Sequence, residues 1–345
     1  MTKAIITGGC GFIGHHLIEH LLKNTGWELY ILDRLTYAAK GFDRVRDIDA
    51  FDDRRCTFFT IDLASGISDG VGDEICDAEY VFHLAAETHV DNSIVDPLPF
   101  VKANVLGTCQ MLEFARIMPN LKGLLYFSTD EVFGPALLKD DVEDPRSIKP
   151  MCRCDHNEYY EWDRYNSTNP YSATKAGGEE LTLAYANTYG LPAFITHTMN
   201  CFGERQHPEK FIPKTIKRVL DGKLVEIHSD PTGIISGSRS YIHCRNVADA
   251  MLFLIQGSFV PREKYNIVGE REVSNLRLAT DIADILGKPL KSKMVNFHES
   301  RPGHDLRYAL CGEKMRTLGW QPPVDFYGSL EKTIRWTLDH KDDWL

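Results

Sequence analysis

Apolar and polar positions follow two alternating rhythms through the first 200 residues of the chain. Short apolar runs predict buried strands, and stretches with apolar residues three or four positions apart predict helices. The expected strands are residues 3–7, 28–33, 56–61, 80–84, 123–128 and 192–198. The expected helices are residues 12–23, 97–118 and 171–189. This alternation is typical of a parallel sheet with helices on both faces.

The alternation of strand and helix patterns becomes less regular after residue 200. Helical patterns recur at residues 209–220, 245–255, 274–286 and 326–339, and short strand patterns lie at 224–227 and 264–267. We therefore predict an α/β fold in which residues 1–200 form a Rossmann-like doubly wound parallel sheet. Residues 201–345 are expected to form mainly a smaller C-terminal α/β domain that binds the substrate, and segments of the two domains can interleave.

Residues 135–170 match neither pattern, because they are polar and contain several prolines. A loop of this length is typically a lid or a binding loop. Its Cys152, Cys154 and His156 lack the spacing of a zinc site, so we expect no metal. Its aromatic residues either stack on a base or pack the loop onto its own domain, and the sequence leaves both open. They are Tyr159, Tyr160, Trp162 and Tyr165.

Composition narrows the classes of partner. The formal net charge is −10 and the pI is near 5.7, which argues against DNA or an anionic membrane surface as a partner. Apolar runs are too short to span a membrane, and the chain opens on a strand pattern instead of a signal sequence. The nine cysteines are odd in number and scattered, which indicates reduced thiols in a cytoplasmic protein.

A glycine-rich turn joins the first strand to the first helix. Gly8, Gly11 and Gly14 allow the backbone to approach a pyrophosphate closely, and the helix N-terminus supplies free N–H groups. Asp33 closes the second strand, where a carboxylate can accept hydrogen bonds from the ribose hydroxyls of NAD. Its charge would repel the 2′-phosphate of NADP, although the adjacent Arg34 softens that preference. We therefore predict that the cofactor is NAD.

Two further motifs carry candidate chemistry. Tyr171 and Lys175 lie four residues apart on one helix face. A lysine ammonium beside a phenol lowers the pKa of the tyrosine, which can then take a proton from a sugar hydroxyl as hydride leaves its carbon. Thr129, Asp130 and Glu131 follow the fifth strand, at the edge of the sheet where ligands bind. Thr129 can bind the reacting hydroxyl, and two carboxyls in unlike environments can act as acid and base.

These motifs resemble those of the dTDP-glucose 4,6-dehydratase family, in the extended short-chain dehydrogenase/reductase superfamily, over nearly the full chain. The matching stretches are GGCGFIG (8–14), DRLTYA (33–38), HLAAETHVDNS (83–93), STDEVFG (128–134), NPYSATK (169–175), HPEKFIP (207–213), SRSYIH (238–243), YNIVG (265–269), RPGHDLRY (301–308) and LGW (318–320). The Thr-Asp-Glu triplet is the specific part, because related epimerases and decarboxylases usually have other residues in place of the Asp-Glu pair.

The resemblance implies an internal redox cycle on the sugar of a nucleotide-sugar. Tyr171 would take the 4-hydroxyl proton as hydride passes from C4 to NAD. Glu131 would then remove the C5 proton while protonated Asp130 helps the 6-hydroxyl leave as water. Return of hydride to C6 restores NAD, which should stay bound, and gives a 4-keto-6-deoxy sugar. The family also implies a homodimer formed by the helices at 97–118 and 171–189.

The resemblance implies binding roles for further residues. Cofactor contacts are expected from Gly8, Gly11, Phe12, Ile13, Gly14, Asp33, Arg34, Leu35, Thr36, Asp62, Leu63, Leu84, Ala85, Ala86, Glu87, Tyr171, Lys175 and Cys201. Substrate contacts are expected from Thr88, Thr129, Asn200, Lys210, Phe211, Arg239, Asn266, Arg301, His304 and Tyr308. Arg239 and Arg301 would supply the positive charge that a pyrophosphate requires.

The chain also departs from the family pattern. Cys201 stands where the family often has an Asn, Ala103 stands where it often has Thr, and residues 135–170 and 229–237 differ from the usual loops. The last two departures fall in the regions expected to recognise the base and the sugar of the substrate, so the choice between dTDP and UDP stays open.

Other functions share many of these features. A UDP-sugar 4,6-dehydratase, a 4-epimerase and a uronate decarboxylase share the fold, the NAD site and the Tyr171–Lys175 pair. The Asp130–Glu131 pair argues against the epimerase and the decarboxylase. A non-enzymatic NAD sensor would tend to lose the Tyr–Lys pair, which this chain keeps.

Overall fold

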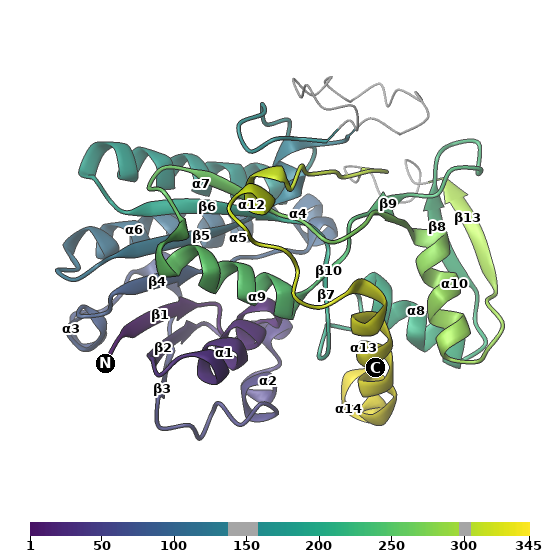
Figure 1. The fold of residues 1–345 in the computed structure, drawn as a ribbon, viewed down its shortest axis with the longest axis horizontal. Helices are drawn as coiled ribbons and strands as arrows, with labels where there is room; N and C mark the ends of the chain where they lie inside the picture. The colour runs from purple at the N-terminus through teal and green to yellow at the C-terminus, as the bar shows by residue number, and fades with distance from the viewer. Residues whose placement is uncertain (137–157, 297–304) are drawn as a thin grey trace.

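Parallel strands form the central sheet of the protein. The computed structural model describes residues 1–136, 158–296 and 305–345. Its seven-stranded sheet has the order β11-β6-β5-β4-β1-β2-β3, and each neighbouring pair is parallel (Figure 1). The strands are β1 Lys3–Thr7, β2 Glu28–Asp33, β3 Cys56–Thr60, β4 Tyr80–His83, β5 Gly123–Thr129, β6 Ala193–Thr198 and β11 Lys264–Ile267. The order β3-β2-β1-β4-β5-β6 is that of a doubly wound dinucleotide-binding fold, which confirms the predicted fold class.

Helices cover both faces of this sheet, which explains why its strands read as continuous apolar runs. Ala4, Ile5 and Ile6 of β1, for example, are completely buried. One face packs against α1 and α9, and the other packs against α3, α6 and α7. The helices are α1 Phe12–Asn24, α2 Asp43–Arg46, α3 Asp69–Ile75, α4 Val90–Val95, α5 Leu98–Phe100, α6 Gly107–Ile117, α7 Pro170–Tyr189, α8 Phe211–Leu220, α9 Cys244–Phe253, α10 Asn275–Ile285, α12 Glu313–Thr317, α13 Phe326–Asp339 and α14 Lys341–Trp344. Short helical turns are η1 Tyr37–Ala39, η2 Leu63–Ser65, η3 Val101–Leu106, η4 Asp130–Phe133 and η5 Leu254–Ser258.

The helix expected at 97–118 contains a π-helical turn, η3, between α5 and α6. Asn104 lies in this turn and is completely buried. Its amide donates to the carbonyl oxygen of Glu87 (3.0 Å) and to the Thr174 hydroxyl (2.9 Å), while its oxygen accepts from the Glu87 N–H (2.8 Å). The π-turn therefore joins the loop after β4 to helix α7. Turns of this kind often accompany functional sites.

A smaller lobe is formed mainly by residues after β6 and lies at the right in Figure 1. Its short strands are β7 Cys201–Phe202, β8 Val225–Ser229, β9 Ser238–Arg239, β10 Ile242–His243, β12 Val273–Ser274 and β13 Ser292–Asn296. Its core joins β7, α8, α10 and α13 through residues such as Phe202, Ile216, Leu278 and Leu330. The chain then crosses between the two parts, because β11 pairs with β6 and α9 packs against α1. The division at residue 200 stays a prediction.

The described aromatic residues of the long loop largely pack onto the protein itself. Tyr159 stacks on Phe133 with ring centres 5.3 Å apart, and its hydroxyl donates to the Pro135 carbonyl (2.9 Å). Tyr165 contacts the same Phe133 ring edge-on. The indole of Trp162 donates to a Glu263 carboxylate oxygen at 3.4 Å. Cys152, Cys154 and His156 lie outside the described residues, so the expectation of no metal there stays a prediction.

Helices in the described ranges are each too short or too polar to cross a membrane.

Candidate active site

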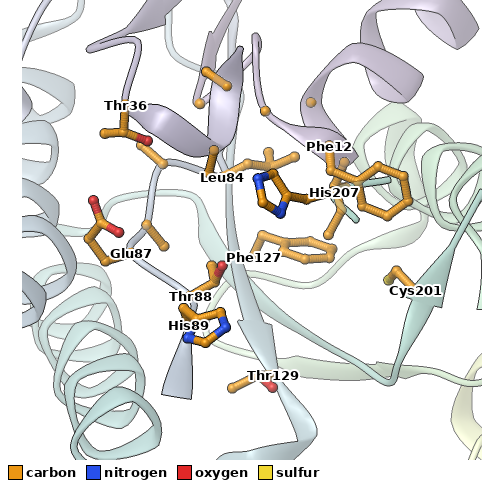
Figure 2. Close-up of a pocket in the computed structure, with 18 of the residues that line it drawn as sticks. Phe12, Thr36, Leu84, Glu87, Thr88, His89, Phe127, Thr129, Cys201 and His207 are labelled. Carbon is orange, nitrogen blue, oxygen red and sulfur yellow. The ribbon is translucent and has the colours of Figure 1, made fainter. Parts of the chain in front are cut away.

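A cleft of about 380 Å³ opens at the carboxyl ends of strands β1 to β6. This volume is within the range of small-molecule and cofactor sites. Figure 2 shows Phe12 and Cys201 on one side of the cleft, Glu87, Thr88 and His89 on the other, and Phe127 and Thr129 along β5 between them. Parallel strands bring segments that are distant in sequence to one edge of the sheet, so the segments that follow six strands share this cleft.

The glycine turn before α1 lies against the cleft. Gly8 has φ of +72°, and a Cβ there would lie 2.8 Å from Cα of Ala85. A Cβ on Gly14 would lie only 2.3 Å from the carbonyl oxygen of Gly8. Both positions therefore require glycine, and the N-terminal N–H groups of α1 remain open to a ligand. This cradle fits the pyrophosphate of a dinucleotide.

Acidic side chains surround the ribose end of this cradle. The Asp33 carboxylate accepts from the backbone N–H of Cys10 (2.9 Å) and of Leu35 (2.8 Å). Burial raises the pKa of Asp33, and these backbone hydrogen bonds counteract the increase. Arg34 donates to the carboxylates of Glu87 and Asp62, so its charge is partly neutralised. A carboxylate next to an already paired arginine favours a ribose without a 2′-phosphate.

Arg44 is a cleft residue that the sequence interpretation missed. It is completely buried, and its guanidinium donates to the carbonyl oxygens of Ala38 (2.5 Å) and Arg205 (3.0 Å). Burial lowers the pKa of Arg44 to about 10, and the nearby Asp33 charge opposes this change. Its Nη2 has no hydrogen-bond partner within the described residues. Nothing in the sequence singles out Arg44 from its charged neighbours.

Helix α7 carries Tyr171 and Lys175, and its first turn fixes Glu131. Asn169 caps the helix by accepting from the Ser172 N–H (2.8 Å). The amide nitrogen of the same Asn169 donates to the Glu131 carboxylate at 3.1 Å. A side chain can serve both partners because the amide has a separate acceptor and donor. The start of the helix therefore sets the position of Glu131 relative to Tyr171.

The charge state of the Tyr171–Lys175 pair differs from the sequence-based expectation. Burial, followed by the charge of Glu131, raises the pKa of Tyr171, and a hydrogen bond with Thr129 partly opposes the rise. The Lys175 ammonium donates to the Phe127 carbonyl (2.7 Å), and burial lowers the pKa of Lys175 to about 7. The net shift of the tyrosine pKa is thus upward, opposite to the expected direction, because desolvation is the largest effect on both groups.

The two adjacent carboxyls have different environments. The chain leaves β5 through the turn η4, so Asp130 and Glu131 no longer alternate across a strand. Asp130 is buried and accepts from the Thr129 hydroxyl (3.1 Å), while its Oδ2 has no hydrogen-bond partner within the described residues. Burial and then the charge of Glu131 raise the pKa of Asp130 to about 7. An acid that retains its proton near neutrality therefore lies next to a carboxylate held by Asn169.

The cleft brings together most of the residues expected from the sequence. It is lined by Gly8, Gly11, Phe12, Ile13, Gly14, Asp33, Arg34, Thr36, Asp62, Leu63, Leu84, Ala85, Ala86, Glu87, Thr88, Thr129, Asp130, Glu131, Tyr171, Lys175, Asn200, Cys201, Lys210 and Phe211. The cleft lining does not include Leu35, Arg239, Asn266 or Tyr308. Arg301 and His304 lie outside the described residues, so their roles stay predictions.

Three of the residues outside the lining have contacts of their own. Arg239 lies over the Tyr308 ring at 4.4 Å and donates to backbone carbonyl groups. The Tyr308 hydroxyl is buried without a partner within the described ranges, and the charges of Asp130 and Glu131 raise the pKa of Tyr308 after the larger effect of burial. Asn266 is completely buried and hydrogen-bonds within the protein interior.

Several lining residues near the lobe were missed, although they lie inside quoted motifs. His207 and Glu209 belong to HPEKFIP, and His89 belongs to HLAAETHVDNS. The Glu209 carboxylate lies 3.4 Å from Nε2 of His89 and 3.6 Å from Nδ1 of His207. The sequence did offer a signal for them, because all three residues lie in the quoted motifs close to positions that were predicted to bind the substrate. By contrast, the 229–237 stretch folds on itself around Asp230, which accepts from the N–H groups of Ile234 and Ile235.

The fold and the cleft define a class of NAD-dependent enzyme. The chain belongs to the NAD dependent epimerase/dehydratase family, whose model matches residues 4–268.

Individual relatives are similar over almost the whole chain. A dTDP-glucose 4,6-dehydratase of Escherichia coli is 33% identical, over 99% of this chain and 95% of its own length. A trifunctional UDP-glucose 4,6-dehydratase/UDP-4-keto-6-deoxy-D-glucose 3,5-epimerase/UDP-4-keto-L-rhamnose-reductase of Arabidopsis thaliana is 33% identical, and the match covers 99% of this chain but 48% of that protein. The crystal structure of a dTDP-glucose 4,6-dehydratase of Streptomyces venezuelae, with NAD bound, superposes with a TM-score of 0.84 at 31% identity, covering 99% of both chains.

The glycine cradle generates a first prediction. Gly14→Ala places a methyl group against the Gly8 carbonyl oxygen, so the turn has to shift, at a cost of about 1–3 kcal/mol in the free energy of unfolding. We expect a lower Tm and a large loss of NAD affinity by calorimetric titration. Gly26→Ala is the control, because a Cβ there meets no atom within 4 Å. Wild-type NAD affinity in Gly14→Ala would show that the turn does not contact the cofactor.

The buried Asp130 generates a second prediction, about stability and pH. Its pKa is about 7 in the folded protein and about 3.9 in an unfolded chain, so the folded state binds the proton more tightly. The stabilisation is complete below about pH 4 and is lost as pH rises towards 7, by up to roughly 1.4 kcal/mol per pH unit. Compared with Asp130→Asn, the wild type should lose stability across this window in urea titrations. The exposed Asp52→Asn is the control, and parallel wild-type and Asp130→Asn curves would contradict the raised pKa.

Proposed function

We propose that this protein is an NAD-dependent nucleotide-sugar 4,6-dehydratase, a hydro-lyase. It converts an NDP-hexose, with dTDP-glucose as the first candidate, into the NDP-4-keto-6-deoxyhexose and water. The observation that carries the proposal is the Asp130–Glu131 pair, in which one carboxyl retains its proton near neutral pH and the other is held by Asn169. The relatives named as dTDP- and UDP-glucose 4,6-dehydratases support the same reaction.

The residues of the cleft fit NAD, since Gly8 and Gly14 leave space that a Cβ would fill and Asp33 lies at the ribose end. When bound, NAD supplies a hydride acceptor for C4 and a donor for C6 within one catalytic cycle. Net oxidation is therefore zero, and the cofactor need not leave. Lys175 lines the cleft and donates to the Phe127 carbonyl. In its protonated form it places a positive charge in the part of the cleft that fits the cofactor.

Tyr171 is proposed to take the proton of the sugar 4-hydroxyl. The Thr129 hydroxyl hydrogen-bonds Tyr171, so it can hold the same sugar oxygen in line with the phenol. The raised pKa of Tyr171 means that its phenolate needs positive charge nearby, which Lys175 provides in its protonated form. The 4-keto group that results makes the C5 proton acidic.

Glu131 and Asp130 then share the elimination of water. The Glu131 carboxyl is anchored by the amide nitrogen of Asn169, which positions it for removal of the C5 proton. Asp130 holds its proton up to about pH 7, and its unpartnered Oδ2 is available to the leaving 6-hydroxyl. This division favours a dehydratase over a 4-epimerase or a decarboxylase, since neither of those reactions needs an acid at C6.

The test of the overall reaction is product analysis. A panel of dTDP- and UDP-hexoses and UDP-uronates is incubated with the purified protein and followed by mass spectrometry. Loss of one water from a hexose supports the dehydratase and identifies the nucleotide. A product of unchanged mass would indicate an epimerase, and loss of carbon dioxide would indicate a decarboxylase.

Variants of the catalytic residues should separate the half-reactions. Asp130→Asn and Glu131→Gln leave Tyr171 in place, so both should still reduce the cofactor but lose water roughly 10²–10⁴-fold more slowly. Tyr171→Phe should block the first step. Stopped-flow absorbance of the reduced nicotinamide distinguishes these outcomes, because the carboxyl variants should accumulate it and the tyrosine variant should not. Elimination at the wild-type rate in Glu131→Gln would reject the dehydratase assignment.

The outer surface next to α7 supports a homodimer. Val95, Leu98 and Val101 are 86%, 66% and 44% exposed, and they lie on α4, α5 and η3, which pack beside α7. Contiguous exposed apolar side chains of this kind mark protein contact surfaces. We propose that two copies pair through this face. The scattered cysteines and the composition support a cytoplasmic location.

Charge placed on this face should dissociate the dimer. Leu98→Glu combined with Val101→Glu puts two like charges into the proposed contact, and we expect the mass by light scattering to fall to that of one chain at micromolar concentration. Ile234→Lys changes an 80% exposed apolar residue elsewhere and should leave the mass unchanged. A wild-type protein that is already monomeric would contradict the proposed dimer.

A further inference from the structure

Glu179 is a completely buried carboxylate on helix α7. It lies eight residues after Tyr171 and four after Lys175, so the three side chains share one face of the helix. That face packs against the sheet, where α7 runs alongside β5 and β6 (Figure 1). A buried acid is rare unless it is paired, so its partners indicate what it does.

Donors from four separate segments surround the Glu179 carboxylate. It accepts from the Ser128 hydroxyl at the end of β5 and from the Tyr165 hydroxyl of the segment before α7. Nε2 of His197 on β6 lies 3.1 Å away, and the Lys264 ammonium on β11 lies 3.9 Å away. Burial alone would raise the pKa of Glu179, but His197, Lys264 and Ser128 bring it below its usual range. Glu179 is therefore a fixed negative charge within the protein.

Asn266 orients His197 towards this carboxylate. The Asn266 amide nitrogen donates to the carbonyl oxygens of Tyr159 (3.1 Å) and Cys311 (3.2 Å), which fixes which end of the amide is oxygen. That oxygen lies 3.0 Å from Nδ1 of His197, so Nδ1 donates to it. Nε2 is then left facing Glu179. This interior role explains why Asn266 of the YNIVG motif is absent from the cleft.

Lys175, by contrast, contacts uncharged groups. Its ammonium donates to the Phe127 carbonyl (2.7 Å) and lies 4.2 Å from the centre of the Tyr126 ring. Burial lowers the pKa of Lys175 to about 7, and the charge of Glu179 opposes that decrease. His83 of β4 also faces Lys175, but burial lowers the pKa of His83 to about 3, so it contributes no charge near neutrality.

We propose that Glu179 is a positioning residue that keeps Lys175 in its ammonium form and holds the end of β5 in place through Ser128. The inference rests on the proposed function for the role of the ammonium, since Lys175 supplies the positive charge that Tyr171 needs. The groups facing the pair are Tyr171 on α7, His83 on β4, Tyr126 and Ser128 on β5, His197 on β6, Lys264 on β11, and Tyr165.

The sign of the effect follows from the charges. Replacing Glu179 by Gln removes the anion whose charge opposes the effect of burial on Lys175, so the pKa of Lys175 falls further. The ammonium is then lost at lower pH, and activity that needs it should fail at lower pH as well. A one-unit decrease corresponds to about a tenfold smaller protonated fraction at any pH well above the midpoint.

The experiment compares Glu179→Gln with the wild type by two readouts on the protein as purified. The first is the pH profile of the stopped-flow nicotinamide reduction with dTDP-glucose. The second is trace acetylation of Lys175 by acetic anhydride, which reacts with the neutral amine and is quantified on its peptide by mass spectrometry. Both midpoints should move about one pH unit lower, while rates at acidic pH approach those of the wild type. Glu180→Gln, at an exposed position on the same helix, should leave both midpoints unchanged.

Several outcomes would overturn the inference. An equal loss of rate at every pH would indicate a purely structural role, and unchanged acetylation midpoints would show that Glu179 does not control Lys175. Should Glu179→Gln fail to fold, Glu179→Asp withdraws the charge by one methylene and should give a smaller shift in the same direction; an unshifted midpoint would reject the proposal. A wild type that reduces no nicotinamide with any nucleotide-sugar would contradict the proposed function alone, because the acetylation readout needs no substrate.

Discussion

The packing of helix α7 against the carboxyl end of β5 determines the geometry of the whole site. The N-cap of the helix and two positions within it each hold a different part of the strand end or of the turn after it. Asn169 holds Glu131, Lys175 donates to the Phe127 carbonyl, and Glu179 accepts from Ser128. The residues with proposed chemistry are thus fixed by bonds from a single rigid element. Placement by a helix is more exact than placement by loops alone, since each rotamer is restrained by packing.

Burial, which makes this placement rigid, also changes the acid–base properties of three of its groups. It raises the pKa of Asp130 and Tyr171 and lowers that of Lys175. The first change is useful, because a carboxylic acid that stays protonated near neutrality can donate to a leaving hydroxyl. The other two oppose the formation of a phenolate next to an ammonium. A compensating charge is therefore needed, and the buried carboxylate of Glu179 lies on the helix face where it can act.

Sequence patterns predicted the parts of the molecule that depend on local chemistry. The parallel sheet followed from apolar runs, and the cradle followed from Gly8 and Gly14, whose lack of a Cβ is a requirement of the local backbone. Contacts between distant segments were beyond the reach of such patterns. Arg44 is buried by carbonyl groups at positions 38 and 205, and the π-turn at Asn104 depends on Glu87 and Thr174. Asn266 sits in a recognisable motif, but only its partners Tyr159 and Cys311 show that it faces the interior.

The segment before α7, which differs from the usual family loop, also contacts the charged groups around Glu179. Tyr165 donates to Glu179, and the rings of Tyr165 and Trp162 lie 4.3 and 4.6 Å from the Lys264 ammonium that approaches the same carboxylate. Burial lowers the pKa of Lys264 and the charge of Glu179 opposes that decrease, while the two aromatic rings add favourable contacts with the ammonium. Changes in this segment would therefore alter the surroundings of the Glu179 carboxylate on α7. Lys210 and Phe211 line the cleft, whereas Glu179 and Lys264 are buried outside its lining, so the proposed substrate contacts and this group of charges occupy different parts of the molecule.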